Sequence, residues 1–207
     1  MLFRSPRYRG AAPIPRAILA GERVTGVTVL YLGEGMDAGD IIAQERVPIA
    51  PDDTGGTLAA VLSARGGALL AAAVRAIERG TSVRTPQDES AATFAPKLAK
   101  SDGLIDWRAP AEEIALKVRA LQPWPGAYTF AVAAGVPRML KILEASVCAG
   151  ESGETGRVLR CGNEGIRVGT GRGVLVIRAV QPEGGRAMTA PEFARGHRGI
   201  EGTALGR

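Results

Sequence analysis

Residues 81–103, TSVRTPQDESAATFAPKLAKSDG, constrain the fold most, because the apolar periodicity that precedes them stops there and a different pattern follows. The segment is rich in proline, serine, threonine and aspartate, which is typical of connecting segments. A chain of 207 residues is long enough for two small domains. We therefore predict one domain over residues 1–84, a linker over 85–103 and a second domain over 104–207.

The first part carries the pattern of an α/β layer. AAPIPRAILAGE, residues 11–22, predicts a short helix. TGVTVLYLG and DIIAQERVPIA, residues 25–33 and 40–50, predict two strands that pair with each other. Helix, strand and strand, followed by a further helical pattern, are typical of a fragment of an α/β fold.

The longest apolar stretch, TLAAVLSARGGALLAAAVRAI, predicts a helix that begins after Asp53 or Thr54 and ends at Gly80. Its Gly66-Gly67 pair predicts a break or kink, because glycine is a poor helix former. Two arginines and the glycine pair argue against a membrane span. The first ten residues, MLFRSPRYRG, lack the apolar core of a secretory signal. We expect a cytoplasmic protein with no membrane partner.

The second part predicts a helix and then an antiparallel β structure. APAEEIALKVRALQ predicts a helix with Pro110 in its first turn. GTGRG, residues 169–173, predicts a hairpin turn rather than a phosphate loop, because a strand and not a helix follows it. Thr189 and Glu192 have the spacing of a capping box. Strands are expected at residues 127–135, 137–147, 156–162, 165–171 and 173–182, which suggests a small barrel or sandwich.

The motif GEGMDAGDII, residues 33–42, places two carboxylates, Asp37 and Asp40, three positions apart in a glycine-flanked turn. Such a pair can exchange protons or hold a cation, but each use needs further groups. No Asn, His or Cys lies in the surrounding segment, and the chain's single histidine, His197, is expected at the surface. Taken in isolation, the simpler interpretation is that both carboxylates bind backbone amides in the turn. We expect no metal.

Basic and aromatic residues in the linker and beyond it are candidates for nucleic-acid contacts. Residues 104–207 hold 14 Lys and Arg against 10 Asp and Glu, within a chain of formal net charge +5. Trp107 and Trp124 are suited to base stacking. Trp124 lies between Pro123 and Pro125, however, and packing against the domain explains it as well. The same holds for the densest basic cluster, for which solvated surface is the alternative to phosphate binding. That cluster comprises Lys97, Lys100, Arg108, Lys117 and Arg119.

Six stretches, taken together and in order, resemble the methionyl-tRNA formyltransferases. They are PRYRGAAPIPRAILAGE, TGVTVLYLGEGMDAGDIIAQERVPI, DTGGTL, QDESAATFAPKL, IDWRAPAEEI and VRALQPWPGAYT. The resemblance implies a partial formyltransferase-type Rossmann-like α/β domain followed by an OB-like small β-barrel domain that binds tRNA. It also implies that a formyl group passes from 10-formyltetrahydrofolate to the amino group of methionyl-initiator tRNA in translation initiation.

The resemblance carries over onto individual residues of this sequence. The family's catalytic Asp lies in a Leu/Met-Asp-x-Gly-Asp turn, which matches Asp37, and Gly39 and Asp40 are then expected to shape that turn. The five basic residues of the cluster are the expected tRNA contacts. Folate contacts are expected from Pro6, Gly35 and Met36.

The sequence departs from the family at its start. The family's Asn-x-His pair precedes the Pro-Arg-Tyr-Arg-Gly segment, whereas this chain has Met1 to Ser5 before Pro6. We therefore expect a truncated catalytic domain, the C-terminal two-thirds of the enzyme, with impaired activity. The alternatives are a tRNA-binding remnant without catalysis and an amino-sugar-nucleotide formyltransferase. We expect a monomer, with dimerisation through the exposed edge of the truncated sheet as the alternative.

Overall fold

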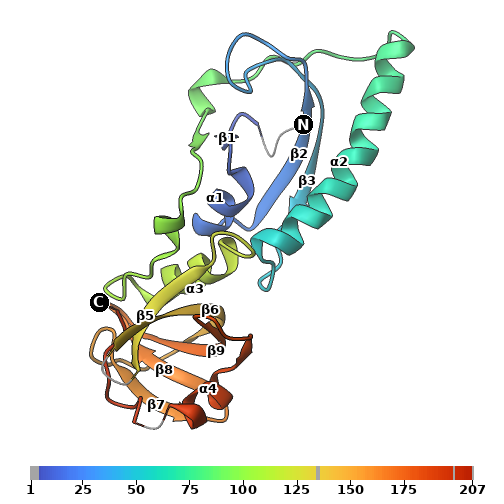
Figure 1. The fold of residues 1–207 in the computed structure, drawn as a ribbon. Helices are drawn as coiled ribbons and strands as arrows, with labels where there is room; N and C mark the ends of the chain where they lie inside the picture. The colour runs from blue at the N-terminus through green and yellow to red at the C-terminus, as the bar shows by residue number, and fades with distance from the viewer. Residues whose placement is uncertain (1–4, 134–135, 198, 207) are drawn as a thin grey trace. The chain divides into compact units, whose positions relative to one another are not determined.

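The computed structural model describes residues 5–133, 136–197 and 199–206 (Figure 1). The chain forms two compact units, Met1–Leu98 and Ala99–Arg207, which we call unit 1 and unit 2 and describe one at a time. The segment expected as a linker contributes residues to both units, and in unit 1 one of them, Ala95, is fully buried.

A β-hairpin lies at the centre of unit 1. Strands β2 (Val24–Leu30) and β3 (Ile41–Pro48) are antiparallel, with Val24 opposite Pro48 and a register shift near Leu30. The predicted pairing of these two strands is confirmed. Because the hairpin's connection spans residues 31–40, the motif with the two carboxylates lies in a long loop at one end of the hairpin.

Helix α2 (Gly55–Glu78) packs against the hairpin and is continuous over 24 residues. Thr54 is the N-cap, and Gly80 follows the helix with a φ of 67°, as the sequence predicts. The expected break at Gly66-Gly67 is wrong. The helical path is retained because the buried face, which includes the fully buried Leu62, packs on the hairpin, and tertiary packing outweighs the roughly 1 kcal/mol that each glycine costs.

By length and composition alone, α2 is the one helix among the described residues that is apolar enough to cross a membrane. Core helices of soluble proteins meet the same criterion, so the finding is weak by itself. Only 22% of its most apolar window is buried.

The rest of unit 1 joins segments that are far apart in the sequence. Strand β1 (Arg9–Gly10) pairs in parallel with β4 (Phe94–Ala95). Between them in the sequence lie helix α1 (Pro13–Leu19), whose Ile18 is fully buried, and the short 3-10 helix η1 (Glu89–Ala91). This pairing brings residues 87–95 against the start of the chain, beside the loop of residues 31–40.

Unit 2 contains an antiparallel sheet with the strand order β5-β6-β9-β8-β7, and β10 pairs with β9. The five strands expected from the sequence are confirmed, as is the hairpin turn at residues 170–173 between β8 and β9. The elements are η2 (Lys100–Gly103), α3 (Ala111–Ala120), β5 (Ala127–Ala133), β6 (Val136–Cys148), β7 (Val158–Gly162), β8 (Gly165–Gly169), β9 (Val174–Pro182), β10 (Met188–Thr189) and α4 (Ala190–Gly196).

The sheet of unit 2 is open, so the expectation of a closed small barrel is wrong. Within the described residues, the edge strands β5 and β7 do not pair with each other. Residues near the C-terminus take their place. The amide of Gly206 donates to the carbonyl of Phe130 in β5 at 2.9 Å, and the amide of Val158 in β7 donates to the carbonyl of Thr203 at 2.9 Å. These hydrogen bonds occupy backbone groups at the edges of β5 and β7. In a closed barrel, the backbone groups of these two edges would instead pair with each other.

The core of unit 2 is a single cluster of buried apolar residues. Ile114 and Val118 of α3 and Phe193 of α4 pack against the sheet. Trp107 is also buried, and its indole Nε1 donates to Thr129 Oγ1 at 3.0 Å. Trp107 therefore packs within the core and does not present a face for base stacking, whereas Trp124 is 51% exposed.

Candidate functional site

The loop of residues 31–40 holds Asp37 in a left-handed backbone conformation, with a φ of 56°. Aspartate tolerates this region better than most residues, but the conformation still costs free energy and needs support from its surroundings. Gly39 supplies part of that support, because a side chain at this position would place its Cβ 1.8 Å from the carbonyl oxygen of Tyr31. The amide of Tyr31 in turn donates to the carbonyl of Asp40 at 2.9 Å, which closes the loop.

The carboxylate of Asp37 contacts the beginning of unit 1. Its Oδ2 accepts a hydrogen bond from the amide of Gly10 at 2.8 Å. The simpler interpretation of the motif, a carboxylate that binds a backbone amide, is thus partly confirmed, although the amide lies 27 residues away and not in the turn. Within the described part of the chain, Oδ1 of Asp37 and the carboxylate of Asp40 have no hydrogen-bond partner.

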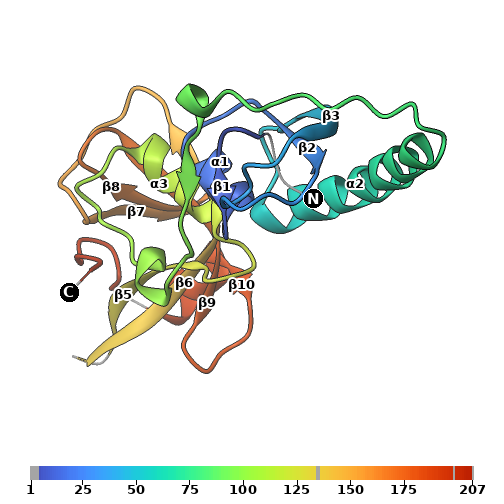
Figure 2. The same cartoon turned by 90° about the horizontal axis from the view of Figure 1, so that it is seen from above.

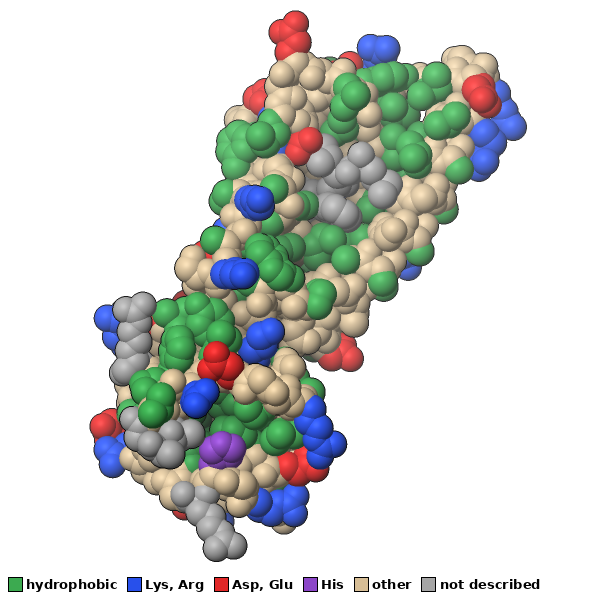
Figure 3. Space-filling model, in the orientation of Figure 1, with side chains coloured by type: hydrophobic (Ala, Val, Ile, Leu, Met, Phe, Trp, Pro, Cys, Tyr) green, Lys and Arg blue, Asp and Glu red, His purple; other side chains and the backbone are tan. Residues whose placement is uncertain are grey.

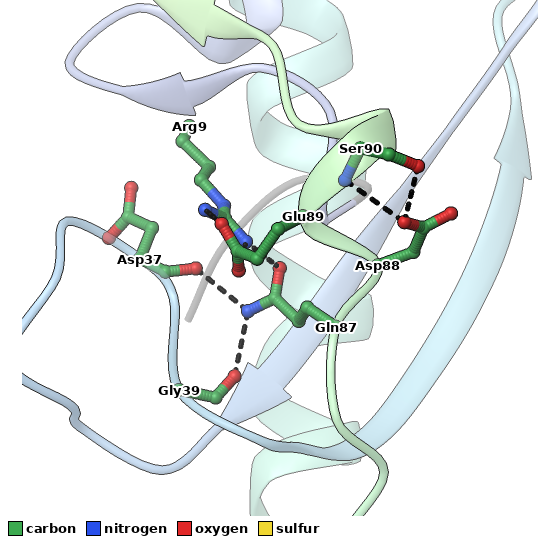
Figure 4. Close-up of polar contacts among 7 residues, drawn as sticks. All are labelled: Arg9, Asp37, Gly39, Gln87, Asp88, Glu89 and Ser90. Atoms are coloured by element: carbon green, nitrogen blue, oxygen red, sulfur yellow. Dashed lines mark hydrogen bonds and ion pairs between the residues drawn. The ribbon is translucent and has the colours of Figure 1, made fainter.

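Gln87 fixes the main chain of the same loop (Figure 4). Its Nε2 donates to the carbonyl oxygens of Asp37 and Gly39, at 2.8 and 2.7 Å. Its Oε1 accepts from Arg9 Nη2 at 3.0 Å. Figure 4 shows the Asp37 side chain pointing away from this amide while its carbonyl faces it. The loop is therefore held through its backbone, which leaves the carboxylate for other contacts.

Arg9 is the buried cation of this network. Its side chain is 3% exposed, and it binds Glu89 through two hydrogen bonds, Nη1 to Oε2 at 2.8 Å and Nη2 to Oε1 at 2.7 Å. The hydrogen bond with Glu89 raises the pKa of Arg9, burial opposes this, and the charges of Glu89 and Asp37 add to the rise. The pKa of Glu89 is lowered, chiefly by Arg9. Both groups therefore stay charged at neutral pH.

The sequence alone did not identify Arg9, Gln87 and Glu89 as part of the site. They belong to the stretches PRYRG and QDES, which carried the resemblance to the family. A buried arginine needs a carboxylate partner. However, Arg9 and Glu89 lie 80 positions apart, so their pairing cannot be predicted from the spacing of residues in the sequence.

Among the residues expected to contact folate, Met36 lies near Gly10, whose amide binds Asp37. Met36 is 64% exposed, and a methyl group at Gly10 would lie 3.6 Å from its Sδ. Gly35 is exposed and Pro6 is half-buried. That these residues contact folate stays a prediction.

The residues expected to contact tRNA differ in how available they are. Lys97 and Lys100 are exposed, in unit 1 and unit 2 respectively. Arg108 is exposed but pairs with Asp106 through its Nε and Nη2, at 2.9 and 2.8 Å. Lys117 Nζ donates to the carbonyl of Leu104 at 2.9 Å, and burial lowers its pKa. Arg119 is half-buried near the end of α3.

His197 belongs to unit 2 and follows α4. Its Nδ1 donates to the carbonyl of Phe193 at 2.9 Å and its ring stacks on the Phe193 ring, with the centroids 4.0 Å apart. The side chain is half-buried rather than fully at the surface. In the part of the chain that the structure describes, no group of three or more His, Cys, Asp or Glu side chains is arranged to hold a metal ion.

Residues 5–74 match the family described as Formyl transferase, and residues 97–198 match Formyl transferase, C-terminal domain. The chain belongs to the formyl transferase family. A methionyl-tRNA formyltransferase of Symbiobacterium thermophilum is 46% identical over 196 residues, which cover 92% of this chain and 58% of that relative. This formyl transferase chain thus spans under two thirds of that relative's length.

Solved structures share the fold at lower identity. HypX from Aquifex aeolicus, in complex with tetrahydrofolic acid, is 23% identical with a TM-score of 0.69, over 98% of this chain and 36% of that one. An N-formyltransferase from Helicobacter canadensis, in complex with folinic acid and dTDP-3-aminofucose, is 19% identical with a TM-score of 0.66, over 84% of this chain and 64% of that one. At these identities the likeness concerns the formyl transferase fold alone.

Proposed function

We propose that this formyl transferase chain serves formyl transfer from 10-formyltetrahydrofolate to the amino group of methionyl-initiator tRNA, in translation initiation in the cytoplasm. The observation that carries the proposal is the Met-Asp-Ala-Gly-Asp turn, in which Asp37 is held with one carboxylate oxygen on the amide of Gly10 and the other without a partner in the described chain. The 46% identity to a methionyl-tRNA formyltransferase supports the choice of acceptor.

The reaction explains why a carboxylate is needed at this place. The attacking amine must lose a proton as it bonds to the formyl carbon, and a tetrahedral oxyanion must be stabilised by hydrogen-bond donors. A fixed carboxylate accepts or orients that proton, or keeps an adjacent imidazole charged. In this chain, Asp37 supplies the carboxylate, and Gln87 and Arg9 position its loop.

The donors that stabilise the oxyanion are expected outside this chain. Within its described residues, no Asn or His side chain hydrogen-bonds to Asp37. We therefore expect the 207-residue chain alone to transfer formyl groups far more slowly than a complete enzyme. A chain that binds tRNA without catalysis is the second candidate, and the same observation favours it. No contact among the described residues of unit 1 or unit 2 favours an amino-sugar nucleotide as acceptor.

Matched substitutions in the Asp37 loop test the proposal. The chain is joined to the N-terminal part of the Symbiobacterium relative that it lacks, and turnover is measured with charged initiator tRNA and 10-formyltetrahydrofolate. Asp37→Asn keeps an oxygen that accepts from Gly10 but removes the charge, so we expect turnover to fall about 100-fold or more. Asp40→Asn, a matched substitution in the same loop, should reduce turnover much less. Equal losses from both variants would contradict a catalytic role for Asp37.

Turnover of the fused form, and not tRNA binding, separates the two candidates. Both predict that the chain alone binds tRNA with an affinity that falls as salt rises. A pure tRNA-binding protein shows no turnover even in the fused form. Tight binding of a sugar nucleotide that tRNA does not compete with would overturn both.

A further inference from the structure

The side chain of Gln87 makes three hydrogen bonds that fix the orientation of its amide. Its Nε2 donates to the carbonyl oxygens of Asp37 and Gly39, at 2.8 and 2.7 Å. Its Oε1 accepts from Arg9 Nη2 at 3.0 Å. An amide nitrogen has two hydrogens to donate, and the amide oxygen has none. The reverse orientation would place Oε1 against two carbonyl oxygens and Nε2 against a guanidinium, so both ends of Gln87 select the same orientation.

Arg9 gives Gln87 a fixed partner. The Arg9 side chain is 3% exposed, and two hydrogen bonds, at 2.8 and 2.7 Å, join its guanidinium to the carboxylate of Glu89. A buried guanidinium that is already paired has little freedom left to lose when it binds a further group. Gln87 and Glu89 belong to the segment around the start of η1, which lies beside the connection between β2 and β3 in both Figure 1 and Figure 2. The buried ion pair thus anchors Gln87 next to the loop of Asp37.

Strand β1 supplies a second contact to the same loop. Successive amides of a paired strand point to opposite sides. The amides of Arg9 and Ala11 donate to carbonyls of the segment that contains β4, at 2.8 and 3.0 Å. The amide of Gly10 points the other way and donates to Asp37 Oδ2 at 2.8 Å. Asp37 is therefore held twice, through its main chain by Gln87 and through its side chain by Gly10.

The two contacts on Asp37 do different things. Its φ of 56° lies in the left-handed region, which a residue other than glycine keeps only where its surroundings hold it. The hydrogen bond from Gly10 acts on the end of the Asp37 side chain, which turns about its own bonds. The hydrogen bonds from Gln87 act on carbonyl groups, whose directions follow from the backbone angles of the loop. Gln87 is thus the contact that fixes where the Asp37 side chain starts.

We propose that Gln87 is a positioning residue for formyl transfer, and that Arg9 and Glu89 act through it. Gln87 holds the main chain of Asp37 so that one carboxylate oxygen binds Gly10 and the other is available to the reaction. The inference rests on the proposed function, because it assigns to Gln87 a part in that reaction without contact with the substrates. Position matters at such a site, since a displacement of about 1 Å can lower a rate about 100-fold.

Turnover of the fused form tests the role of Gln87. Gln87→Met has a similar length and no donor, so we expect kcat to fall about 10- to 100-fold while KM for charged tRNA changes less than about twofold. Gln181→Met is the matched control, because Gln181 is also half-buried and donates to the carbonyl of Gly185 in unit 2, at 3.1 Å. Its kcat should stay within about twofold of the parent. Gln87→Glu is a poorer test, since it adds charge at an end of unit 1 where Figure 3 already shows Asp and Glu side chains.

A double variant tests whether Glu89 and Arg9 act through Gln87. The Glu89 side chain is 66% exposed, so Glu89→Gln loosens the hold on Arg9 without emptying a buried place. This substitution should lower kcat about threefold in the fused form, and should have no effect in the Gln87→Met background. An equal loss in both backgrounds would show that Glu89 and Arg9 influence the reaction by another route.

NMR of the chain alone tests the positioning without turnover. The amide proton of Gly10 bonds to the carboxylate of Asp37, so its chemical shift should follow the titration of that carboxyl group in the parent chain. In Gln87→Met this dependence should be lost, and the Gly10 amide should exchange with solvent at least about tenfold faster, although Gln87 does not bind Gly10. In Gln181→Met both properties should stay as in the parent.

Three outcomes overturn the inference. Unchanged kcat in Gln87→Met, in a fused form whose parent is active, shows that the loop holds Asp37 without Gln87. A Gly10 amide that keeps its titration and its slow exchange in Gln87→Met shows the same in the chain alone. A fall in kcat that only matches the unfolded fraction, measured by circular dichroism at the assay temperature, makes Gln87 purely structural. A parent fused form without turnover instead contradicts the proposed function, and the Gly10 measurement still decides the positioning.

Discussion

The two units differ in how completely they bury their own apolar residues. Unit 2 gathers α3, α4 and its sheet around one contiguous core, in which Ile142, Ile166 and Ile177 are almost fully buried. Unit 1 has a two-stranded hairpin, with α2 partly covering it, and its Leu32 and Phe94 are 97% and 67% exposed. A hairpin of two strands is marginal without further packing. Unit 2 is therefore expected to be stable by itself, and unit 1 to depend on additional contacts.

Substitutions in the two cores should produce the largest effects and test this difference. Ile177→Ala in unit 2 and Leu62→Ala in unit 1 both truncate fully buried side chains, and each is expected to lower the free energy of unfolding by about 2–5 kcal/mol. In calorimetry we expect two thermal transitions, the upper one from unit 2 and the lower one from unit 1. Ile177→Ala should lower the midpoint temperature of the upper transition, and Leu62→Ala should lower that of the lower transition. A single transition that moves equally in both variants would show that the units unfold together.

The buried Arg9 should give the next largest effect, confined to unit 1. Arg9→Met removes the guanidinium group that binds Glu89 and Gln87. The free energy of unfolding of unit 1 should therefore fall by about 1–3 kcal/mol. Arg9→Lys keeps the charge but not the paired geometry, so it should recover only part of this loss. Denaturant unfolding followed by the fluorescence of the tyrosines in unit 1 measures both. Full recovery by lysine would show that charge alone matters.

Short-range features of both units were predictable from the sequence. Adjacent apolar runs predicted the β2–β3 pairing, and Thr54 and Thr189 predicted the starts of α2 and α4, because each depends on residues a few positions apart. Asp37 was identified through the family motif and not through its contacts. The amide that binds its carboxylate belongs to Gly10, and no local pattern relates these two residues.

The errors concern packing over longer distances. Helix propensity predicted a break at Gly66-Gly67, but contacts of α2 with the hairpin keep the helix continuous. Strand spacing predicted a small barrel or sandwich and the family resemblance a barrel, but Gly206 and Thr203 form hydrogen bonds with the edge strands, and the sheet stays open. Burial of Trp107 depends on the core of unit 2 and on Thr129, which lies 22 residues away. In each case the outcome depends on which segments meet in space.

The N-caps of α2 and α4 allow a comparison of the two units through substitutions with a smaller effect on stability. Thr54 and Thr189 both form capping boxes, with Thr57 and Glu192 respectively. Thr54→Ala and Thr189→Ala should each cost about 1 kcal/mol, because each leaves an amide of the first helical turn without its partner. Thr54→Ala should lower the midpoint temperature of the lower transition, from unit 1, and Thr189→Ala should lower that of the upper transition, from unit 2. If Thr189→Ala also lowers the first transition, the units are coupled.

The smallest effect is expected at Asp106, whose side chain pairs with Arg108, a predicted phosphate contact of unit 2. The hydrogen bonds from Arg108 lower the pKa of Asp106 to about 2. Because this pKa is lowered, the pairing is fully present above the ordinary value of 3.8 and is lost as pH falls through about 2, so Arg108 stays paired at neutral pH. A carboxyl titration followed by NMR checks the value.

Asp106→Asn should release Arg108 for one more phosphate contact. The salt dependence of tRNA binding, measured as the slope of log K against log salt concentration, should then steepen by about 0.7–0.9. Glu112→Gln is the control, since it also removes one negative charge but its contact with Arg172 is long, at 3.8 Å. An equal change in both variants would mean that only net charge matters. A change in Asp106→Asn alone would place Arg108 at the RNA, in the unit whose core is complete within this chain.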